Sequence, residues 1–317
     1  MDARLLEILA CPICKGALIY RREAGVLVCR LDRLAYPVRD GVPVMLEEEA
    51  RQLASDDPLL EHGTPLGAFH VAIPARAGSS RLPGKALADL GGKPMLQWVY
   101  EKACVAGATD VSIATDDERI AAAARTFGAA VRMTSALHAS GTDRIAELAA
   151  IEGWPDGDIV VNVQGDEPLI PPANIAQVAA LLDAYSEAAV ATLSSDIASL
   201  EEFLDPNTVK VVTDRRGRAL YFSRASIPLH RDGAPGGASG VRSFEGARRH
   251  VGIYAYRVAA LRMLTGLAPT PLERAEKLEQ LRALEHGLVI QVAEAGEPPG
   301  PDVNTPEDLR RVAALIG

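Results

Sequence analysis

One loop of the chain combines positive charge, hydroxyl groups and glycine in a way that suits an anionic ligand. It has the sequence PARAGSSRLPGK and spans residues 74–85. Gly78 and Gly84 allow the backbone to approach a ligand closely. Its cations and hydroxyl donors are Arg76, Ser79, Ser80, Arg81 and Lys85. Charge-assisted hydrogen bonds from such groups suit a polyphosphate, although the G-x-x-x-x-G-K-[ST] order of a Walker A loop is absent.

The position of this loop favours ligand binding over a simple solvated turn. An apolar strand, predicted at residues 69–73, leads directly into the loop. A second polar loop, at 164–168, follows another apolar strand predicted at 159–163. In an open α/β sheet, ligands bind at the carboxyl ends of strands. A basic turn that only joins two elements is the alternative interpretation.

Short apolar strands alternate with Ala- and Leu-rich helical segments beyond residue 68. The predicted strands are 69–73, 110–114, 159–163, 188–193, 209–213 and 250–256. The predicted helices are 94–106, 117–127, 142–151, 172–184, 272–285 and 306–316. This alternation predicts an α/β domain with a mostly parallel sheet flanked by helices, of Rossmann-like type. Cys104, within one predicted helix, is expected to be a small buried hydrophobe.

Composition narrows the class of protein. The 317-residue chain has a formal charge of −9, which argues against nonspecific nucleic-acid binding. Its four cysteines favour a reducing compartment without a disulfide framework. No basic-apolar signal and no apolar stretch of membrane-spanning length is evident, so neither secretion nor membrane insertion is expected. We predict a small β-rich domain at 1–54, a linker at 55–68 and the α/β domain at 69–317.

The α/β part strongly resembles the 3-deoxy-manno-octulosonate cytidylyltransferases, also called CMP-Kdo synthetases. The resemblance rests on PARAGSSRLPGK, GGKPMLQWV, HASGTDR, VNVQGDEPLI, VKVV, ALYFSRASIP, RHVGIYAYR, LEQLR and NTPEDL, in this order over residues 69–317. It implies a nucleotide-diphospho-sugar transferase-like fold. It also implies a cytoplasmic, Mg²⁺-dependent homodimer that joins CTP and the acidic sugar Kdo for lipopolysaccharide synthesis.

The resemblance also implies roles for the loop residues. Arg76, Ser79, Arg81 and Lys85 match triphosphate-binding positions, and their charges suit neutralisation of a leaving pyrophosphate. Asp166 matches the family's magnesium-binding aspartate, and a hard cation prefers such oxygen ligands. A turn or capping role is the alternative for Asp166.

The second metal position departs from the family pattern. Asn304 stands where the family usually has aspartate, so the ligand brings no negative charge and should weaken the site. Asp302, two residues earlier, is a possible substitute. No His–carboxylate dyad is evident in the sequence, so we expect the metal to activate the attacking sugar hydroxyl.

The remaining matched residues divide between nucleotide and sugar. Those implied on the cytidine side are His138, Ser140, Gly141, Thr142 and Gln164. Those implied on the acidic-sugar side are Lys210, Arg224, His250, Tyr254, Glu279 and Gln280. The alternatives are a helix N-cap at 140–143 and structural hydrogen bonding for the others.

The first sixty residues resemble a Trm112-like, or UPF0434, domain, through LLEILACPICKG and LAYPVRDGVPVMLEEEAR. The spacing of two zinc-ribbon knuckles is shown by Cys11, Cys14, Cys29 and Asp32. A four-thiolate site requires Cys in place of Asp32, so we favour a fold held by packing and turns over an occupied Zn²⁺ site.

Three functions follow from these patterns. The first is CMP-Kdo synthesis, and the second is cytidylyl transfer to a related acidic or 8-amino sugar, because the phosphate and metal loops would serve either acceptor. The third is a scaffold that binds a protein partner through the N-terminal domain, as Trm112-like domains can.

Overall fold

The computed structural model separates the chain into two compact units, Met1–Pro65 and Leu66–Gly317. The structure describes residues 9–13, 18–21, 24–29, 32–39, 41–54, 57, 59, 68–76, 78, 82–138, 140–231 and 243–316. Four predicted binding residues lie outside these ranges, namely Cys14, Ser79, Ser80 and Arg81. Among the described residues, no helix is both long and apolar enough to cross a membrane.

The N-terminal unit is a small antiparallel sheet, as predicted for a β-rich domain. Its elements are β1 (Ile19–Arg21), β2 (Val26–Cys29), β3 (Leu34–Arg39), β4 (Val42–Pro43), η1 (Glu47–Glu49) and β5 (Arg51–Gln52). The strand order is β1-β2-β3-β4, and β5 also pairs with β3. Leu27, Leu34 and Tyr36 form its core together with Cys11 and Cys29.

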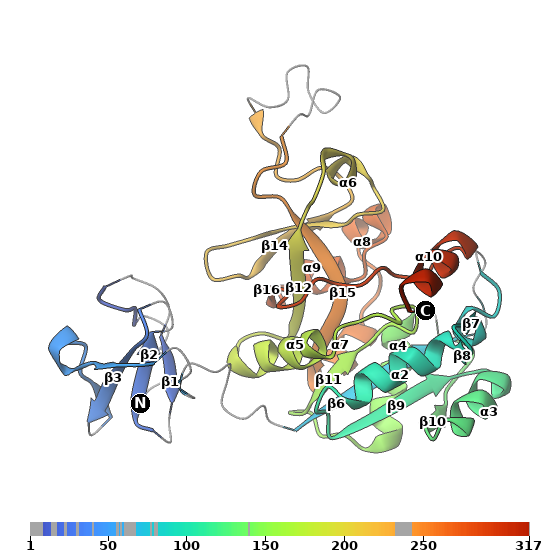
Figure 1. Ribbon diagram of the computed structural model, residues 1–317, viewed down its shortest axis with the longest axis horizontal. Coiled ribbons are helices and arrows are strands. Elements are labelled where there is room, and N and C mark those ends of the chain that lie inside the picture. The colour runs from blue at the N-terminus through green and yellow to red at the C-terminus, as the bar shows by residue number, and fades with distance from the viewer. Residues whose placement is uncertain are drawn as a thin grey trace. The chain divides into compact units, whose positions relative to one another are not determined.

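The C-terminal unit is built on a sheet with the strand order β10-β9-β6-β11-β15-β12-β16 (Figure 1). The bounds are β6 (Phe69–Ala75), β9 (Asp110–Thr115), β10 (Ala130–Met133), β11 (Ile159–Asn162), β12 (Val190–Asp196), β15 (Arg248–Arg257) and β16 (Ile290–Glu294). A branch adds β13 (Lys210–Thr213) and β14 (Ala219–Ser223), and β7 (Asp89–Leu90) and β8 (Lys93–Pro94) form a separate ribbon.

The predicted α/β class is confirmed, and the sheet is mixed because one of its central strands is reversed. β10, β9, β6 and β11 are parallel to one another, whereas β15 runs antiparallel to both β11 and β12. Parallel neighbours need a crossover, usually through a helix. The chain instead reaches β15 after the β13–β14 hairpin, and β13 itself pairs antiparallel with β15.

Helices cover both faces of this sheet, as predicted. Their bounds are η3 (Lys85–Leu87), α2 (Met95–Cys104), α3 (Glu118–Thr126), α4 (Gly141–Glu152), α5 (Pro172–Ala184), α6 (Leu200–Leu204), α7 (Val258–Thr265), α8 (Pro271–Glu276), α9 (Gln280–Glu285) and α10 (Pro306–Ile316). Residues of α2 and α5 pack in one hydrophobic cluster with the sheet. Residues of α4, α7 and α9 pack in a second cluster, so the sheet is buried on both faces.

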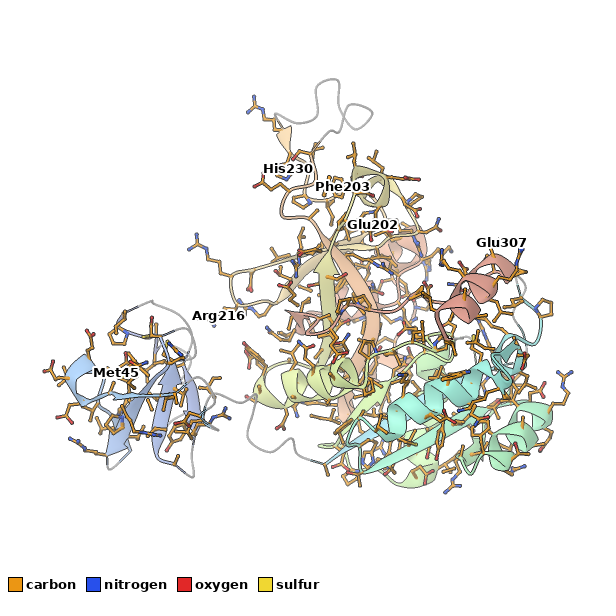
Figure 2. All side chains as sticks on the ribbon, viewed as in Figure 1. Met45, Glu202, Phe203, Arg216, His230 and Glu307 are labelled. Atoms are coloured by element: carbon orange, nitrogen blue, oxygen red, sulfur yellow. The ribbon has the colours of Figure 1, made fainter. Side chains whose placement is uncertain are left out.

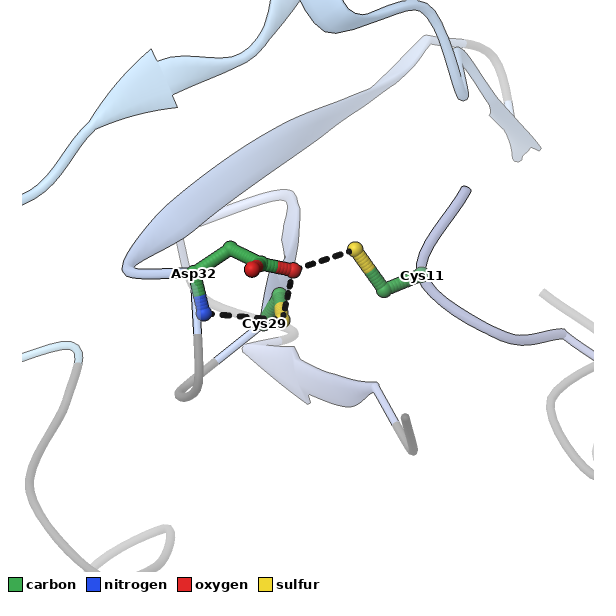
Figure 3. A group of neighbouring side chains, drawn as sticks. All are labelled: Cys11, Cys29 and Asp32. Carbon is green, nitrogen blue, oxygen red and sulfur yellow. Dashed lines mark hydrogen bonds between the residues drawn. The ribbon is translucent and has the colours of Figure 1, made fainter. Parts of the chain in front are cut away.

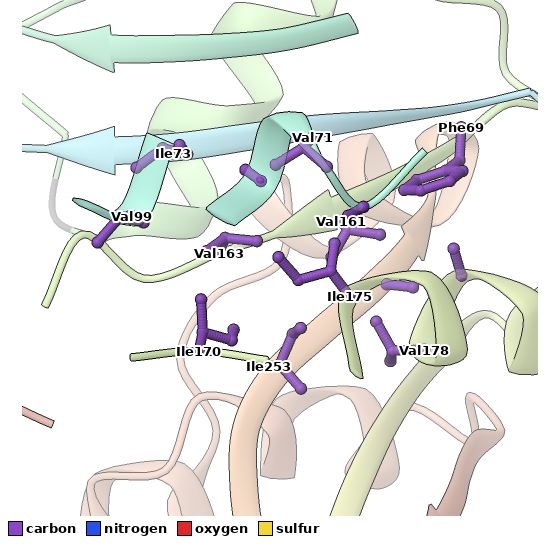
Figure 4. Packing of buried hydrophobic residues seen from close by; sticks show 14 of the residues in the cluster. Phe69, Val71, Ile73, Val99, Val161, Val163, Ile170, Ile175, Val178 and Ile253 are labelled. Atoms are coloured by element: carbon purple, nitrogen blue, oxygen red, sulfur yellow. The ribbon is translucent and has the colours of Figure 1, made fainter. Parts of the chain in front are cut away.

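The alternation of side chains along β6 decides which residues enter which cluster. Phe69, Val71 and Ile73 point into the first cluster, where they meet Ile175 and Val178 of α5 (Figure 4). Ala72 belongs to the second cluster. Because neighbouring residues of a strand point to opposite faces, the apolar run predicted at 69–73 serves both layers.

A smaller core supports the segments around α6. Phe203 is fully buried there with Ile197 and Ala247. Its neighbour Glu202, labelled with it in Figure 2, pairs with Arg249 of β15 at 3.5 Å. The one-turn helix is therefore held by packing against the segments that flank it and by an ion pair to β15.

Two local predictions are wrong. The helix predicted at 272–285 is two helices, α8 and α9, because Lys277 adopts a left-handed conformation with φ of 55° and ends α8. Cys104 is exposed rather than buried. The buried face of α2 includes Leu96, Val99 and Ala103, and the next residue along the helix is turned away from it.

His70, at the start of β6, links three neighbouring segments. Its Nδ1 lies 2.7 Å from Asp110 Oδ2 and its Nε2 lies 3.0 Å from Asp158 Oδ2. The imidazole also stacks on Trp154, with the ring centroids 4.3 Å apart. The side chain thus joins β9, β6 and the turn before β11 at the amino ends of these strands. The two predicted binding loops lie at the opposite, carboxyl ends.

Replacing His70 by Ala should lower the free energy of unfolding by about 2 kcal/mol, because two carboxylates lose their shared partner and Trp154 loses its stacked ring. Urea unfolding of both proteins measures this loss. His230→Ala is the control, since His230 is only half-buried and its ring contacts a single backbone carbonyl, that of Glu245. Equal losses in the two variants would contradict the assigned role of His70.

Candidate active site

Two parallel neighbouring strands bring the predicted loops to one edge of the sheet. β6 and β11 pair with Ala72 opposite Asn162, and the Val163 N–H donates to the Ala72 carbonyl at 3.1 Å. A Cβ atom at Gly165 would lie 3.1 Å from the carbonyl oxygen of Pro74, so a larger residue would push this backbone aside. The loop after β11 therefore packs directly on the carboxyl end of β6.

A cleft of about 300 Å³ opens at this edge. Its wall brings together many of the residues predicted to bind nucleotide or metal, namely Arg76, Lys85, His138, Ser140, Gly141, Gln164, Asp166 and Asn304. Arg144 also lines the cleft, although the sequence analysis did not select it. Segments far apart in the chain thus form one polar cavity, and the roles of these residues in binding stay predictions.

The ammonium group of Lys85 lies between the two residues predicted to hold metal. Its Nζ donates to Asp166 Oδ2 at 2.5 Å and to Asn304 Oδ1 at 3.0 Å. The side chain of Lys85 is 13% exposed and that of Asp166 is 31% exposed, so water screens the pair only in part. Two oxygen atoms from separate segments therefore face one positive charge.

Asp302 fixes the orientation of the Asn304 amide. Its Oδ2 accepts a hydrogen bond from Asn304 Nδ2 at 2.5 Å. Because an ammonium only donates and a carboxylate only accepts, these bonds decide that the amide oxygen faces Lys85. The Val303 N–H donates to the Asp166 carbonyl at 2.9 Å and attaches this segment to the loop after β11. The geometry thus gives Asp302 an orienting contact, whereas the sequence suggested a substitute ligand.

Glu167 is a further acid of this site that the sequence analysis missed. Burial raises its pKa to about 8, the charges of Asp166 and Asp302 contribute to the rise, and Arg249 opposes it. A Cβ atom at Gly252 would lie 3.6 Å from Glu167 Oε1, so the carboxyl group lies close to β15. The sequence signal that could have identified Glu167 is its position next to Asp166 in the QGDEP motif.

A His–carboxylate pair is present in the cleft wall, contrary to the expectation from sequence. His138 Nε2 lies 2.5 Å from Glu147 Oε2, and the same oxygen accepts the Ser135 N–H at 2.8 Å. His138 and Glu147 are nine residues apart, on a loop and on α4. The pair forms because the loop folds back along the helix, which no local spacing rule indicates.

The start of α4 joins the predicted nucleotide and sugar residues. Ser140 caps the helix and forms a capping box with Asp143, as the alternative interpretation proposed. Ser140 Oγ also donates to Glu279 Oε1 at 3.1 Å, and Thr142 Oγ1 donates to Glu279 Oε2 at 2.9 Å. Burial raises the pKa of Glu279, and these hydrogen bonds oppose the rise. Capping and site formation are therefore compatible at these residues.

The predicted sugar residues divide into two groups. Tyr254, Glu279 and Gln280 line a small second cavity of about 20 Å³ together with Thr142 of α4. Burial lowers the pKa of His250 to about 3, so its imidazole is neutral near pH 7. A neutral imidazole recognises a ligand by hydrogen bonding and not by charge.

Lys210 and Arg224 donate to backbone carbonyls. The buried Lys210 Nζ donates to the carbonyls of Asp205, Thr208 and Arg224 at 2.9, 2.5 and 2.8 Å. Arg224 Nε donates to the carbonyl of Glu276 at 2.7 Å. These bonds hold the β13–β14 hairpin against its neighbours, and contact of either cation with a sugar carboxylate stays a prediction.

The N-terminal unit brings together three of the residues with zinc-knuckle spacing. Cys11 Sγ and Cys29 Sγ donate to Asp32 Oδ2 at 3.1 and 3.2 Å (Figure 3). These ligand atoms lie within 4.8 Å of one another, which makes the group a possible metal site. Hydrogen bonds also account for the cluster, and the preference for packing and turns over an occupied Zn²⁺ site stays a prediction.

The comparisons with known proteins agree with this architecture. The cytidylyltransferase family matches residues 70–291, and the Trm112p-like protein family matches residues 2–41. The family match covers most of the α/β unit. The chain belongs to the cytidylyltransferase family.

Similar proteins place the chain, within this family, among the 3-deoxy-manno-octulosonate cytidylyltransferases. The 3-deoxy-manno-octulosonate cytidylyltransferase of Halorhodospira halophila is 54% identical over 249 residues, covering 78% of this chain and 97% of that protein. The enzyme of the same name from Vibrio parahaemolyticus is 54% identical over 78% of this chain and 98% of its own length. A solved structure of CMP:2-keto-3-deoxy-manno-octonic acid synthetase complexed with CTP superposes with a TM-score of 0.70 at 42% identity, over 79% of this chain and 98% of that chain.

A cytidylyltransferase structure from Leptospira borgpetersenii is more distant. It has a TM-score of 0.51 and 19% identity, and it covers 78% of this chain and 86% of that chain. At this identity the match supports the fold alone.

Replacing Glu167 by Gln should remove a pH dependence from the stability of the metal-free protein. A carboxyl with a raised folded pKa stabilises the protein below its unfolded pKa, and this contribution is lost as pH rises toward about 8. The wild type should therefore lose stability between pH 5 and pH 8.5, and the variant should lose about 1 kcal/mol less.

Urea unfolding at both pH values, with a chelator present, measures the difference. Glu187→Gln is the matched control, because Glu187 is an exposed glutamate in the same unit. If the pH dependence of Glu167→Gln equals that of wild type, the buried protonated carboxyl is not a feature of this protein.

Proposed function

We propose that this protein is an enzyme that transfers the cytidylyl group of CTP to Kdo and releases pyrophosphate. The observation that carries the proposal is the polar cleft in which Lys85 is held between Asp166 and Asn304 beside the exposed Arg76. Such a cleft suits a polyphosphate next to a cation site. The names of relatives at 54% identity support CTP and Kdo as substrates.

The residues present fit the Mg²⁺ that the family implies. The Asp166 carboxylate and the Asn304 amide offer oxygen ligands, which hard cations prefer, and both already face a positive charge. We assign these two residues to the metal, with Asp302 orienting Asn304. Bound Mg²⁺ neutralises phosphate oxygens and makes the α-phosphate more electrophilic.

The protein's own cations have a separate task. Arg76 and Lys85 neutralise the charge that develops on the departing pyrophosphate, and Arg81 joins them by its place in the loop motif. Lys85 holds Asp166 and Asn304 in place, and its ammonium group would be free to bond the phosphates if those two residues held a metal ion. The loop after β11 positions Gln164 and Asp166 along the same cleft.

The acceptor sugar is assigned to the neighbouring residues around α9. Glu279, Gln280 and Tyr254 line the small cavity and offer hydrogen-bond partners for hydroxyl groups. The buried His250, whose Nε2 lies 3.0 Å from Thr192 Oγ1, is assigned beside them through its family motif. A related acidic or 8-amino sugar would use the same phosphate and metal groups. We further propose a cytoplasmic homodimer that supplies lipopolysaccharide synthesis, and light scattering at twice the chain mass tests the dimer.

Pyrophosphate release from CTP tests the proposed function. We expect turnover when both Mg²⁺ and Kdo are present, and little when either is omitted. A panel containing Kdo, its 8-amino analogue and other acidic sugars identifies the acceptor. If the folded protein turns over none of these sugars, the proposal that it is a sugar cytidylyltransferase is wrong.

Asn304→Asp should increase the apparent affinity for Mg²⁺, because it places a full negative charge next to the cation. Asp166→Ala should lower kcat/KM by roughly 100-fold or more, since the charged ligand is lost. Mg²⁺ titrations of the initial rate measure both effects.

Asp302→Ala is the test of amide orientation. It removes the acceptor that holds Asn304 Nδ2, so we expect weaker Mg²⁺ affinity than wild type and stronger affinity than Asp166→Ala. An Asp166→Ala titration that superimposes on wild type would place the metal elsewhere.

A further inference from the structure

The His138–Glu147 pair presents a defined hydrogen-bonding edge within the nucleotide cleft. The His138 side chain lines the cleft and is 22% exposed, so part of the imidazole is reachable by a ligand. Glu147 is held by two bonds, from His138 Nε2 and from the Ser135 N–H. The orientation of the ring is therefore fixed before a ligand binds.

Glu147 determines which ring nitrogen carries the proton. The Ser135 N–H, followed by His138 and Arg144, holds the pKa of Glu147 below its usual range, so this group is a carboxylate and only accepts. Nε2 of His138 must then be the protonated nitrogen. In the neutral ring, Nδ1 is left as a hydrogen-bond acceptor.

The other groups of the cleft indicate which part of a nucleotide lies at this acceptor. Arg76 and Lys85 place positive charge by the loop after β6, and Lys85 bonds Asp166 and Asn304. The triphosphate belongs at that end. At the start of α4, the buried Arg144 that also lines the cleft is paired with Asp116 at 3.3 Å. This part of the cleft has its cation neutralised and suits the base.

We propose that the His138–Glu147 pair reads the 4-amino group of cytosine and so selects CTP over UTP, with Glu147 as the positioning residue. Cytosine offers an N4 donor at the position where uracil has an O4 acceptor. An acceptor at Nδ1 bonds the first and repels the second. The inference rests on the proposed function, because it specifies how that enzyme chooses its nucleotide.

A role as general base is the competing explanation for the same pair. A base would accept the proton of the sugar hydroxyl and act equally with either nucleotide. Removing it would lower kcat for CTP and UTP by the same factor. The ratio of the two nucleotides therefore separates the two roles, whereas the activity with CTP alone does not.

The experiment compares CTP and UTP with wild type and Glu147→Gln. A Gln amide can donate to Nε2, which moves the ring proton to Nδ1 and turns the acceptor into a donor. We expect the ratio of kcat/KM for CTP to that for UTP to fall by about tenfold or more. His138→Gln should lower the same ratio. Glu152→Gln, also on α4 but paired with Arg132, is the matched control and should leave the ratio unchanged.

Binding of CTP and UTP in the presence of Mg²⁺ and without sugar, measured by calorimetry, tests selection without turnover. A loss of the CTP preference in both His138 and Glu147 variants, with folding verified by circular dichroism, supports the proposal. An unchanged preference in both variants overturns it, as does wild-type protein that binds the two nucleotides equally. Preferential CTP binding that depends on Glu147, without turnover of any sugar, would contradict the proposed function and leave this inference standing.

Discussion

The parallel pairing of β6 with β11 is the constraint on which the site depends. It places two polar loops at one sheet edge, and the close contact between Gly165 and the Pro74 carbonyl leaves no layer of side chains between them. Asp166 can then meet Lys85, although 81 residues separate them. The hydrophobic clusters on both faces hold these strands in register, so packing far from the cleft determines its geometry.

Three acidic side chains lie close together beside the cleft, and each is accommodated in a different way. Asp166, Glu167 and Asp302 are close enough to affect one another. Asp166 bonds Lys85, the pKa of Glu167 is raised to about 8, and Asp302 accepts a hydrogen bond from Asn304. Asn304 in place of a fourth acid lowers this repulsion. The same change lowers the attraction for a divalent cation, which makes the orienting contact from Asp302 more important.

Sequence patterns predicted most of the strands, the helices on both faces and the cleft residues, because each rests on local periodicity or a contiguous motif. The reversal of β15, the break at Lys277 and the exposure of Cys104 were not predicted, since they depend on chain path and helix phase. The His138–Glu147 pair was not predicted for a related reason. Its members belong to different elements, and only the folding of a loop along α4 brings them together.

The central claim is that Asp166 and Asn304 hold the metal while Lys85 serves the phosphates. A crystal structure with Mn²⁺ and a non-hydrolysable CTP analogue tests it most directly, because anomalous scattering locates the ion. The account predicts an ion within coordination distance of an Asp166 oxygen and the Asn304 amide oxygen, with Lys85 Nζ moved to a phosphate. An ion bound elsewhere, or Lys85 still bonded to Asp166 beside the bound nucleotide, would contradict it.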